Sequence, residues 1–159
     1  MESKPYLIDW TMNYVKNKDL VLKKLESIQK EKDGFDLYVK YKDRENYFIV
    51  MPVLSDMNSL LQRLNGTAYY TIVTLNSEGN FKMLIENWSK LVHFKFLNMI
   101  FVNPFSNMDK RWVIFPHTHD KICDAASLKT GLKSMFEMVE PIEESSFLSN
   151  VKNLNFTNK

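Results

Sequence analysis

The chain has 159 residues, of which 45% are hydrophobic and 13% are aromatic. This length and composition predict one globular domain with a continuous core and exclude wholesale disorder. The formal net charge of +2 is too small to hold nucleic acid by overall charge, so only a local cluster of basic residues can support that function.

The single cysteine and the amino-terminal residues bear on the compartment. Cys123 has no second cysteine to pair with, which excludes an internal disulfide and is typical of a reducing compartment. Pro5 and Asp9 interrupt the apolar residues at the amino terminus, so we predict neither a secretory signal nor a membrane span there. We therefore expect a cytoplasmic protein with no membrane partner.

The first predicted element is helical. Leu7, Trp10 and Tyr14 indicate a short amphipathic segment, and residues 19–31 then repeat apolar side chains at helical spacing. This stripe consists of Val21, Leu22, Leu25 and Ile28. Gly34 is expected to end the helix, because glycine readily takes the left-handed conformation.

Strands and a short helix follow. The β-rich residues 35–41 and 46–53 predict two strands joined by a polar turn of hairpin length. Asp56 is a candidate cap for a short helix over residues 57–64. Residues 69–75 predict another strand.

The second half of the chain alternates in the same way. Residues 81–92 predict a helix, and the almost wholly apolar residues 96–102 predict a strand buried on both faces. Residues 111–115 predict a further strand, closed by Pro116. A last helix is expected over residues 125–139.

The boundaries of the last helix divide the chain. Either Asp124 or Ser127 could cap its start, and Pro141 prevents its continuation. We therefore predict a single α/β domain over residues 1–141 and a flexible or loosely docked tail over residues 142–159.

The predicted order of elements indicates the fold class. The strand, helix and strand between residues 68 and 102 should form a crossover that joins parallel strands. The hairpin before it makes the sheet mixed. We expect an α/β fold in which helices flank both faces of a single mixed β-sheet.

This order resembles the core of the PD-(D/E)XK nuclease superfamily, which includes restriction-endonuclease-like and Holliday-junction-resolvase-like enzymes. The resemblance covers roughly residues 19–102: a helix, a three-strand meander, a crossover helix and a fourth strand. It implies a restriction-endonuclease-like core. It also matches Glu26 to an acidic residue of the first helix and Asp36 to the aspartate that opens the hairpin.

The family's acidic-x-Lys triplet is not found at its expected position. Residues 49–52 read Ile-Val-Met-Pro, with neither a carboxylate nor a lysine. Two or more carboxylates are needed to hold Mg²⁺ near a scissile phosphate, and the lysine offsets developing charge. The resemblance therefore implies a catalytically degenerate member.

Asp36 and Glu26 have two interpretations. They could form a residual catalytic metal site. Alternatively, Asp36 satisfies backbone donors at the entrance of a strand and Glu26 is a solvated helix residue, which is the interpretation that we favour.

His117 and His119 form the second candidate metal site. On a strand, residues two apart face the same side, so both imidazoles could bind one metal ion. The third ligand would be His93, Asp120, Asp124 or Cys123. Because Pro116 precedes them, we favour a polar surface loop instead.

Basic residues become more frequent between residues 110 and 133. The candidates for contact with nucleic-acid phosphates are Lys110, Arg111, Lys121, Lys129 and Lys133. Lys129 and Lys133 are four residues apart and should share one helix face, although an ordinary solvated surface would show the same spacing.

Three functions remain open. The first, which we favour, is a catalytically degenerate nuclease-like domain that binds nucleic acid or a protein partner, with homodimer formation expected from the resemblance. The second is a divergent metal-dependent nuclease that uses Asp36 with Glu26, or the pair His117 and His119. The third is a structural partner subunit with no nucleic-acid contact. No cofactor is expected except Mg²⁺ in the second case.

Overall fold

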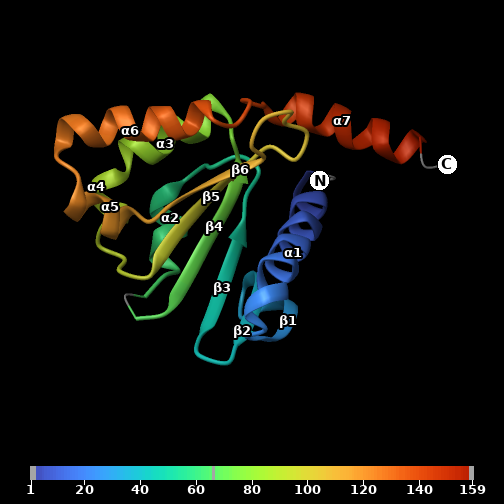
Figure 1. The fold of residues 1–159 in the computed structure, drawn as a ribbon, viewed down its shortest axis with the longest axis horizontal. Helices are drawn as coiled ribbons and strands as arrows, with labels where there is room; N and C mark the ends of the chain where they lie inside the picture. Colours follow the sequence, from blue (N-terminus) through green and yellow to red (C-terminus); the bar gives the residue numbers. More distant parts are fainter. Residues whose placement is uncertain (1–2, 66, 158–159) are drawn as a thin grey trace.

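The computed structural model describes residues 3–65 and 67–157, and these form an α/β fold around a single mixed sheet, as predicted (Figure 1). The strands are β1 Leu25–Lys32, β2 Phe35–Tyr41, β3 Glu45–Val50, β4 Tyr69–Leu75, β5 Leu97–Val102 and β6 Arg111–Ile114. The helices are α1 Ser3–Leu22, α2 Met57–Gln62, α3 Glu78–Glu86, α4 Trp88–Leu91, α5 Pro116–Ile122, α6 Ala125–Glu137 and α7 Glu144–Thr157. No helix in the described ranges is long and apolar enough to cross a membrane.

The strands lie in the sheet in their order along the chain. β1, β2 and β3 form an antiparallel meander, in which Leu37 lies opposite Phe48. β3, β4 and β5 are parallel, and Ile49 of β3 lies beside Ile72 of β4. β6 returns antiparallel to β5. The predicted crossover between residues 68 and 102 therefore does join parallel strands.

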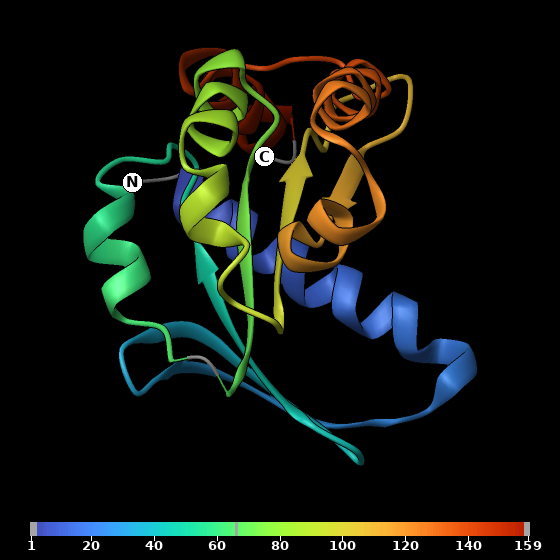
Figure 2. The ribbon, with the colours of Figure 1, turned by 90° about the vertical axis from the view of Figure 1, so that its left-hand side faces the viewer.

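Helices cover both faces of the sheet (Figures 1 and 2). One core cluster, which includes Ile49 and Ile72, lies between the sheet and helices α2, α3, α4 and α6. The other cluster, which includes Val50 and Val73, lies between the sheet and helices α1 and α7. Successive strand residues point to opposite faces, so an apolar strand such as β4 supplies both clusters.

The helix predicted over residues 19–31 is wrong, because α1 ends at Leu22 and β1 begins at Leu25. The Asp19 carboxylate accepts hydrogen bonds from the backbone N–H groups of Lys24 and Leu25, both at 2.9 Å. These bonds satisfy the donors that turn away from the helix. The helical stripe misled the prediction, since Val21 is 89% exposed.

Because residues 25–32 form a strand and not a helix, Gly34 has a different role from the one expected. Asp33 and Gly34 have φ angles of 54° and 82°, and they form the two-residue connection between β1 and β2. Two successive residues with positive φ are typical of a tight β-hairpin. Gly34 is left-handed as expected, but it turns a hairpin rather than ending a helix.

The strands expected at residues 35–41 and 69–75 are confirmed with the same bounds, and β3 stops three residues earlier than expected. Asp56 caps α2, with its Oδ1 accepting from the Ser59 N–H at 3.2 Å. The hydrogen bond from the Ser59 hydroxyl, and after it this backbone hydrogen bond, lower the pKa of the Asp56 carboxyl.

The helix expected over residues 81–92 is interrupted. α3 ends at Glu86, and the side chain of Asn87 donates to the backbone carbonyl of Met83 at 2.8 Å before α4 begins. Side-chain bonds of this kind compete with the helical backbone ladder. The predicted last helix is confirmed as α6, with Asp124 rather than Ser127 as its cap.

Two segments that were expected to be irregular are helical. Residues 116–122 form α5, with Pro116 in the first turn, where its missing N–H costs nothing. Residues 144–157 of the predicted tail form α7, whose Phe147 is fully buried in the core with α1. The described part of the tail is therefore docked on the domain; residues 158–159 of the tail lie outside the described residues.

Two buried asparagines close the carboxyl end of the parallel strands. The amide nitrogen of Asn76 donates to the carbonyls of Phe136 and Val139 at 3.1 and 3.0 Å, and its oxygen accepts from Trp112 Nε1 at 2.7 Å. Asn80 accepts from one backbone N–H and donates to two backbone carbonyls near the ends of β3 and β4. Both side chains have three protein partners.

Replacing Asn76 with Ala should lower the free energy of unfolding by about 3 kcal/mol or more, because three buried groups lose their partner at once. Urea denaturation at fixed pH measures this loss. Asn107→Ala is the matched control at an exposed asparagine and should change stability by less than about 0.5 kcal/mol. A similar small loss in both variants would contradict the role given to Asn76.

Candidate functional site: a basic cavity at the amino end of the sheet

The structure separates Asp36 from Glu26. Glu26 lies on β1, where its carboxylate is 3.8 Å from Lys40 Nζ near the far end of β2. Asp36 lies at the start of β2, four residues from Lys40, which is roughly 13 Å along a strand. The two carboxylates therefore do not form a shared metal site.

The partners of Asp36 fit its backbone-satisfying interpretation. Its Oδ2 accepts from the backbone N–H of Val50 at 2.8 Å, and its Oδ1 lies 3.0 Å from Lys4 Nζ. Asp36 thereby ties the start of β2 to the end of β3 and to the first turn of α1. Both carboxylate oxygens have partners within the protein.

His117 and His119 do not converge either. They lie two residues apart on α5, and such residues do not face each other on a helix. His117 Nδ1 is 2.8 Å from the carbonyl of Val92, whereas His119 Nδ1 is 3.0 Å from the carbonyl of Phe115. Among the described residues, no three His, Cys, Asp or Glu side chains gather as metal ligands would.

The five predicted phosphate-binding residues lie in different places. Lys121 lines a cavity on the face covered by α1, and Arg111 stacks over the Tyr14 ring beside it at 4.7 Å. Lys129 and Lys133 line separate hollows beside α6, on the opposite face. Lys110 Nζ donates to the carbonyls of Pro104 and Ser106 and so supports a loop.

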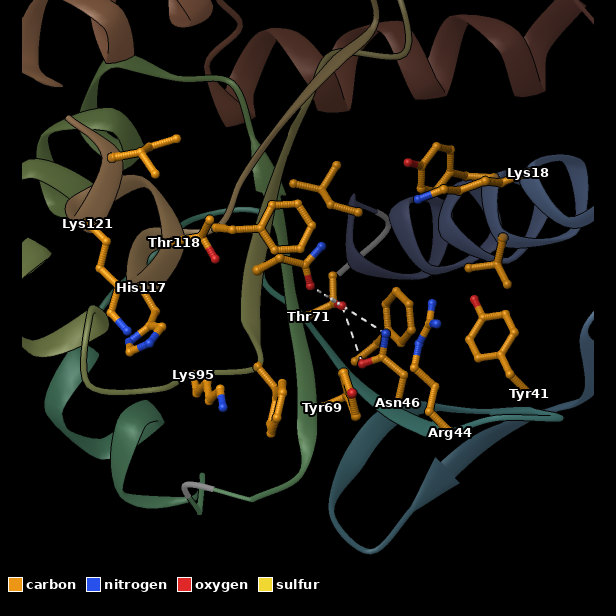
Figure 3. Close-up of a pocket in the computed structure, with 18 residues that line it drawn as sticks. Lys18, Tyr41, Arg44, Asn46, Tyr69, Thr71, Lys95, His117, Thr118 and Lys121 are labelled. Carbon is orange, nitrogen blue, oxygen red and sulfur yellow. Dashed lines mark hydrogen bonds between the residues drawn. The ribbon is translucent and has the colours of Figure 1, made fainter. Parts of the chain in front are cut away.

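The cavity that includes Lys121 is the candidate site, and we call it the amino-end cavity (Figure 3). Its volume is about 630 Å³, and it lies over the amino halves of the parallel strands, with α1 on one side and α5 on the other. Ligands of open α/β sheets usually bind at the carboxyl ends of strands. Here Asn76 and Asn80 fill part of that end, and the described cavity opens at the other.

Three polar side chains form the floor of this cavity. Asn46, Thr71 and Asn98 come from neighbouring strands β3, β4 and β5, and we call them the polar ladder. Asn46 Nδ2 lies 3.2 Å from Thr71 Oγ1, which lies 2.6 Å from Asn98 Oδ1 (Figure 3). Thr71 is buried, whereas both asparagines are partly exposed.

Four exposed cations stand around the floor. Lys18 and Arg44 lie on the side of α1 and the β2–β3 turn, and Lys95 and Lys121 lie on the side of α5 (Figure 3). None of the described residues that line the cavity carries a carboxylate. Asp43 and Asp19 lie near the rim at Tyr41, and Asp43 is 3.8 Å from Arg44 Nη1 in a solvent-exposed pair that contributes little.

Aromatic side chains complete the mouth. The Arg44 guanidinium lies 4.6 Å from the Tyr41 ring centre and 5.7 Å from that of Tyr69, which fixes its position by cation–π contact. Burial raises the pKa of the Tyr41 hydroxyl, and the nearby Arg44 charge opposes this effect only in part. Tyr41 is therefore neutral at physiological pH. Tyr69 and Phe96 pair with ring centres 4.5 Å apart.

Sequence reasoning had singled out two of the residues that line the cavity, Lys121 as a phosphate contact and His117 as a metal ligand. The others are scattered over several segments, none of which forms a recognised motif. One signal was present in the sequence. On the face that packs against α1, each of the strands β3, β4 and β5 carries one polar residue, and the residue two positions later is buried and apolar. Those apolar residues are Phe48, Val73 and Ile100.

Comparisons with known proteins do not assign this chain to a family. No protein-family model, curated protein or solved structure matches it. The case for a function therefore rests on the geometry of the site.

Replacing Asp36 with Ala should lower the free energy of unfolding by about 1–3 kcal/mol, because the partly buried Val50 N–H loses its acceptor. Asp36→Asn keeps an oxygen for Val50 and removes only the half-exposed ion pair with Lys4, so it should cost less than about 1 kcal/mol. Urea denaturation with and without Mg²⁺ measures both. A stabilisation by Mg²⁺ that Asp36→Ala abolishes would instead favour the residual metal site.

Proposed function

We propose that this domain binds single-stranded nucleic acid in the amino-end cavity and does not cleave it. One observation carries the proposal: four basic side chains from four separate segments surround a cavity whose described lining includes no carboxylate. Such an arrangement concentrates positive potential in a concave, partly desolvated place, although the whole chain is close to neutral.

Phosphate groups match the chemistry of this rim. Lysine and arginine that contact phosphates release condensed counterions, and this release supplies most of the non-specific affinity for nucleic acid. Lys18 and Arg44 on one side and Lys95 and Lys121 on the other leave a path between them for a chain of phosphates (Figure 3).

The aromatic side chains favour a single strand over a duplex. Tyr69 and Phe115 are exposed at the cavity, and Phe96 pairs with Tyr69. Unpaired bases stack on such rings at a gain of roughly 1–3 kcal/mol per base. Bases of a duplex are already paired and stacked, so they cannot use these rings or enter a cavity of this size.

The β3 strand supports binding without cleavage. Ile49 and Val50, which stand where the nuclease family carries its triplet, are buried in the two core clusters. The position of Asp36 at the start of β2 supports the resemblance, but the helix that was matched to Glu26 is strand β1, and the antiparallel meander is formed by β1–β3 rather than by residues 35–75. We therefore retain that resemblance as a proposal about architecture, with the chemistry lost.

The expected homodimer and the expected cytoplasmic location also remain proposals. Homodimer formation follows only from the resemblance, and a cytoplasmic location follows from the single cysteine. A protein partner without nucleic acid, or Mg²⁺-dependent cleavage, would each replace the binding function proposed here.

The double variant Lys95→Ala/Lys121→Ala should bind a fluorescent single-stranded oligonucleotide at least tenfold more weakly than the wild type, in EDTA and at low salt. If each lysine contacts one phosphate, the slope of log K against log salt should become shallower by about 1.4. Fluorescence anisotropy over a salt series measures both quantities, with a duplex of the same sequence as a weaker ligand.

Lys129→Ala/Lys133→Ala is the matched control, because it removes the same charge from the opposite face. Its affinity should stay within twofold of the wild type. Equal weakening by both double variants, absence of any binding, or cleavage on addition of Mg²⁺ would contradict the proposed function.

A further inference from the structure

We propose that the polar ladder binds the edge of one unpaired nucleobase, so that Asn46 and Asn98 give the cavity a preference among bases. This inference rests on the proposed function, because the phosphates must first place a strand on the rim. It adds that the floor recognises the chemistry of the base, whereas the rim recognises only charge.

The position of the ladder is unusual for structural polar residues. On the same face, the residues that follow two positions later are buried and apolar in all three strands. α1 lies against β1 and β3, and α7 contributes Phe147 and Val151 to the core. Thr71 and Asn98, the polar residues of β4 and β5 on this face, line the cavity.

The hydrogen bonds of the ladder leave groups for a ligand. Thr71 has one hydroxyl hydrogen, which it gives to Asn98 Oδ1 at 2.6 Å, the shorter of its contacts, and its oxygen accepts from Asn46 Nδ2 at 3.2 Å. The Asn98 amide then has its N–H donors left over, and the Asn46 amide has acceptor capacity at Oδ1. The ladder thus presents a donor on the β5 side and an acceptor on the β3 side.

The structural asparagines of this chain behave differently. Asn76 and Asn80 are buried, and each has three hydrogen bonds to groups of the protein. Among the described residues, the side chains of Asn46 and Asn98 bond only within the ladder, and both are partly exposed. The two ends of the ladder are therefore available to a ligand, whereas Asn76 and Asn80 are not.

The surroundings of the ladder suit a flat heteroaromatic ring. Phe48 and Ile100 flank it on the floor, and Phe96 stands at the mouth. Arg44 comes only two residues before Asn46, so a phosphate on Arg44 would place the attached nucleotide above the ladder. Base edges carry both donors and acceptors, and asparagine is a common partner for them.

The test uses oligonucleotides of abasic spacers with one central nucleotide that carries A, C, G, T or no base. We expect the wild type to bind one base at least tenfold more tightly than the abasic strand and to separate the four bases from one another. In Asn98→Leu and Asn46→Leu the preference should fall to within twofold.

Asn98→Thr is the second variant in case the leucine variants do not fold, since it keeps an oxygen for the Thr71 hydroxyl but lacks the amide donors. It should also lose the preference. Wild-type affinities within twofold for all five strands, or a preference that survives in Asn98→Thr, would overturn the inference and leave the proposed function intact. Failure to bind any strand, including natural single strands, would overturn both.

Discussion

Asn76 follows β4 directly, and its side chain joins three partners that belong to different parts of the fold. It bonds two carbonyls at the end of α6 and the indole of Trp112 on β6. Together with Asn80 it fixes how the helices of one face meet the carboxyl ends of the parallel strands. Protein groups thus fill part of this end, and the cationic cavity lies at the amino end of the sheet.

A similar allocation of residues explains why Asp36 and Glu26 form no shared site. The apolar side chains of β3 pack in the two core clusters. The two carboxylate oxygens of Asp36 contact the Val50 N–H and the Lys4 ammonium. Glu26, the other candidate metal ligand, lies on β1 at the far end of the hairpin from Asp36. The positive rim of the amino-end cavity arises from other segments, namely α1, two turns and α5.

The fold class and most strand positions were predicted from the sequence, because apolar, β-rich runs such as residues 69–75 and 97–102 are typical of buried strands. It failed at β1, because Val21 and Leu22 at the end of α1 continue into Leu25 and Ile28 of β1 with the spacing of a helical stripe. Asp33-Gly34, which is a hairpin signal, was taken for a helix end. It also failed at α7, whose buried residues lie in a polar segment. The local sequence of a segment does not show which distant helix or strand packs against it.

The site was harder to predict for a similar reason. Arg44 and Lys95 are single charges in ordinary turns, and only the register of β3, β4 and β5 brings the polar ladder together. A lone polar residue on one face of an apolar strand was visible in each case. Its meaning depended on knowing that the three strands are neighbours.

Chemical-shift mapping by ¹⁵N-correlated NMR, with a single-stranded hexanucleotide as titrant, tests the central claim most directly. The account predicts that the side-chain amides of Asn46 and Asn98 and the backbone amides around Lys95 and Lys121 shift together along one binding curve. Shifts confined to the α6 face, or a spectrum that does not change, would contradict it.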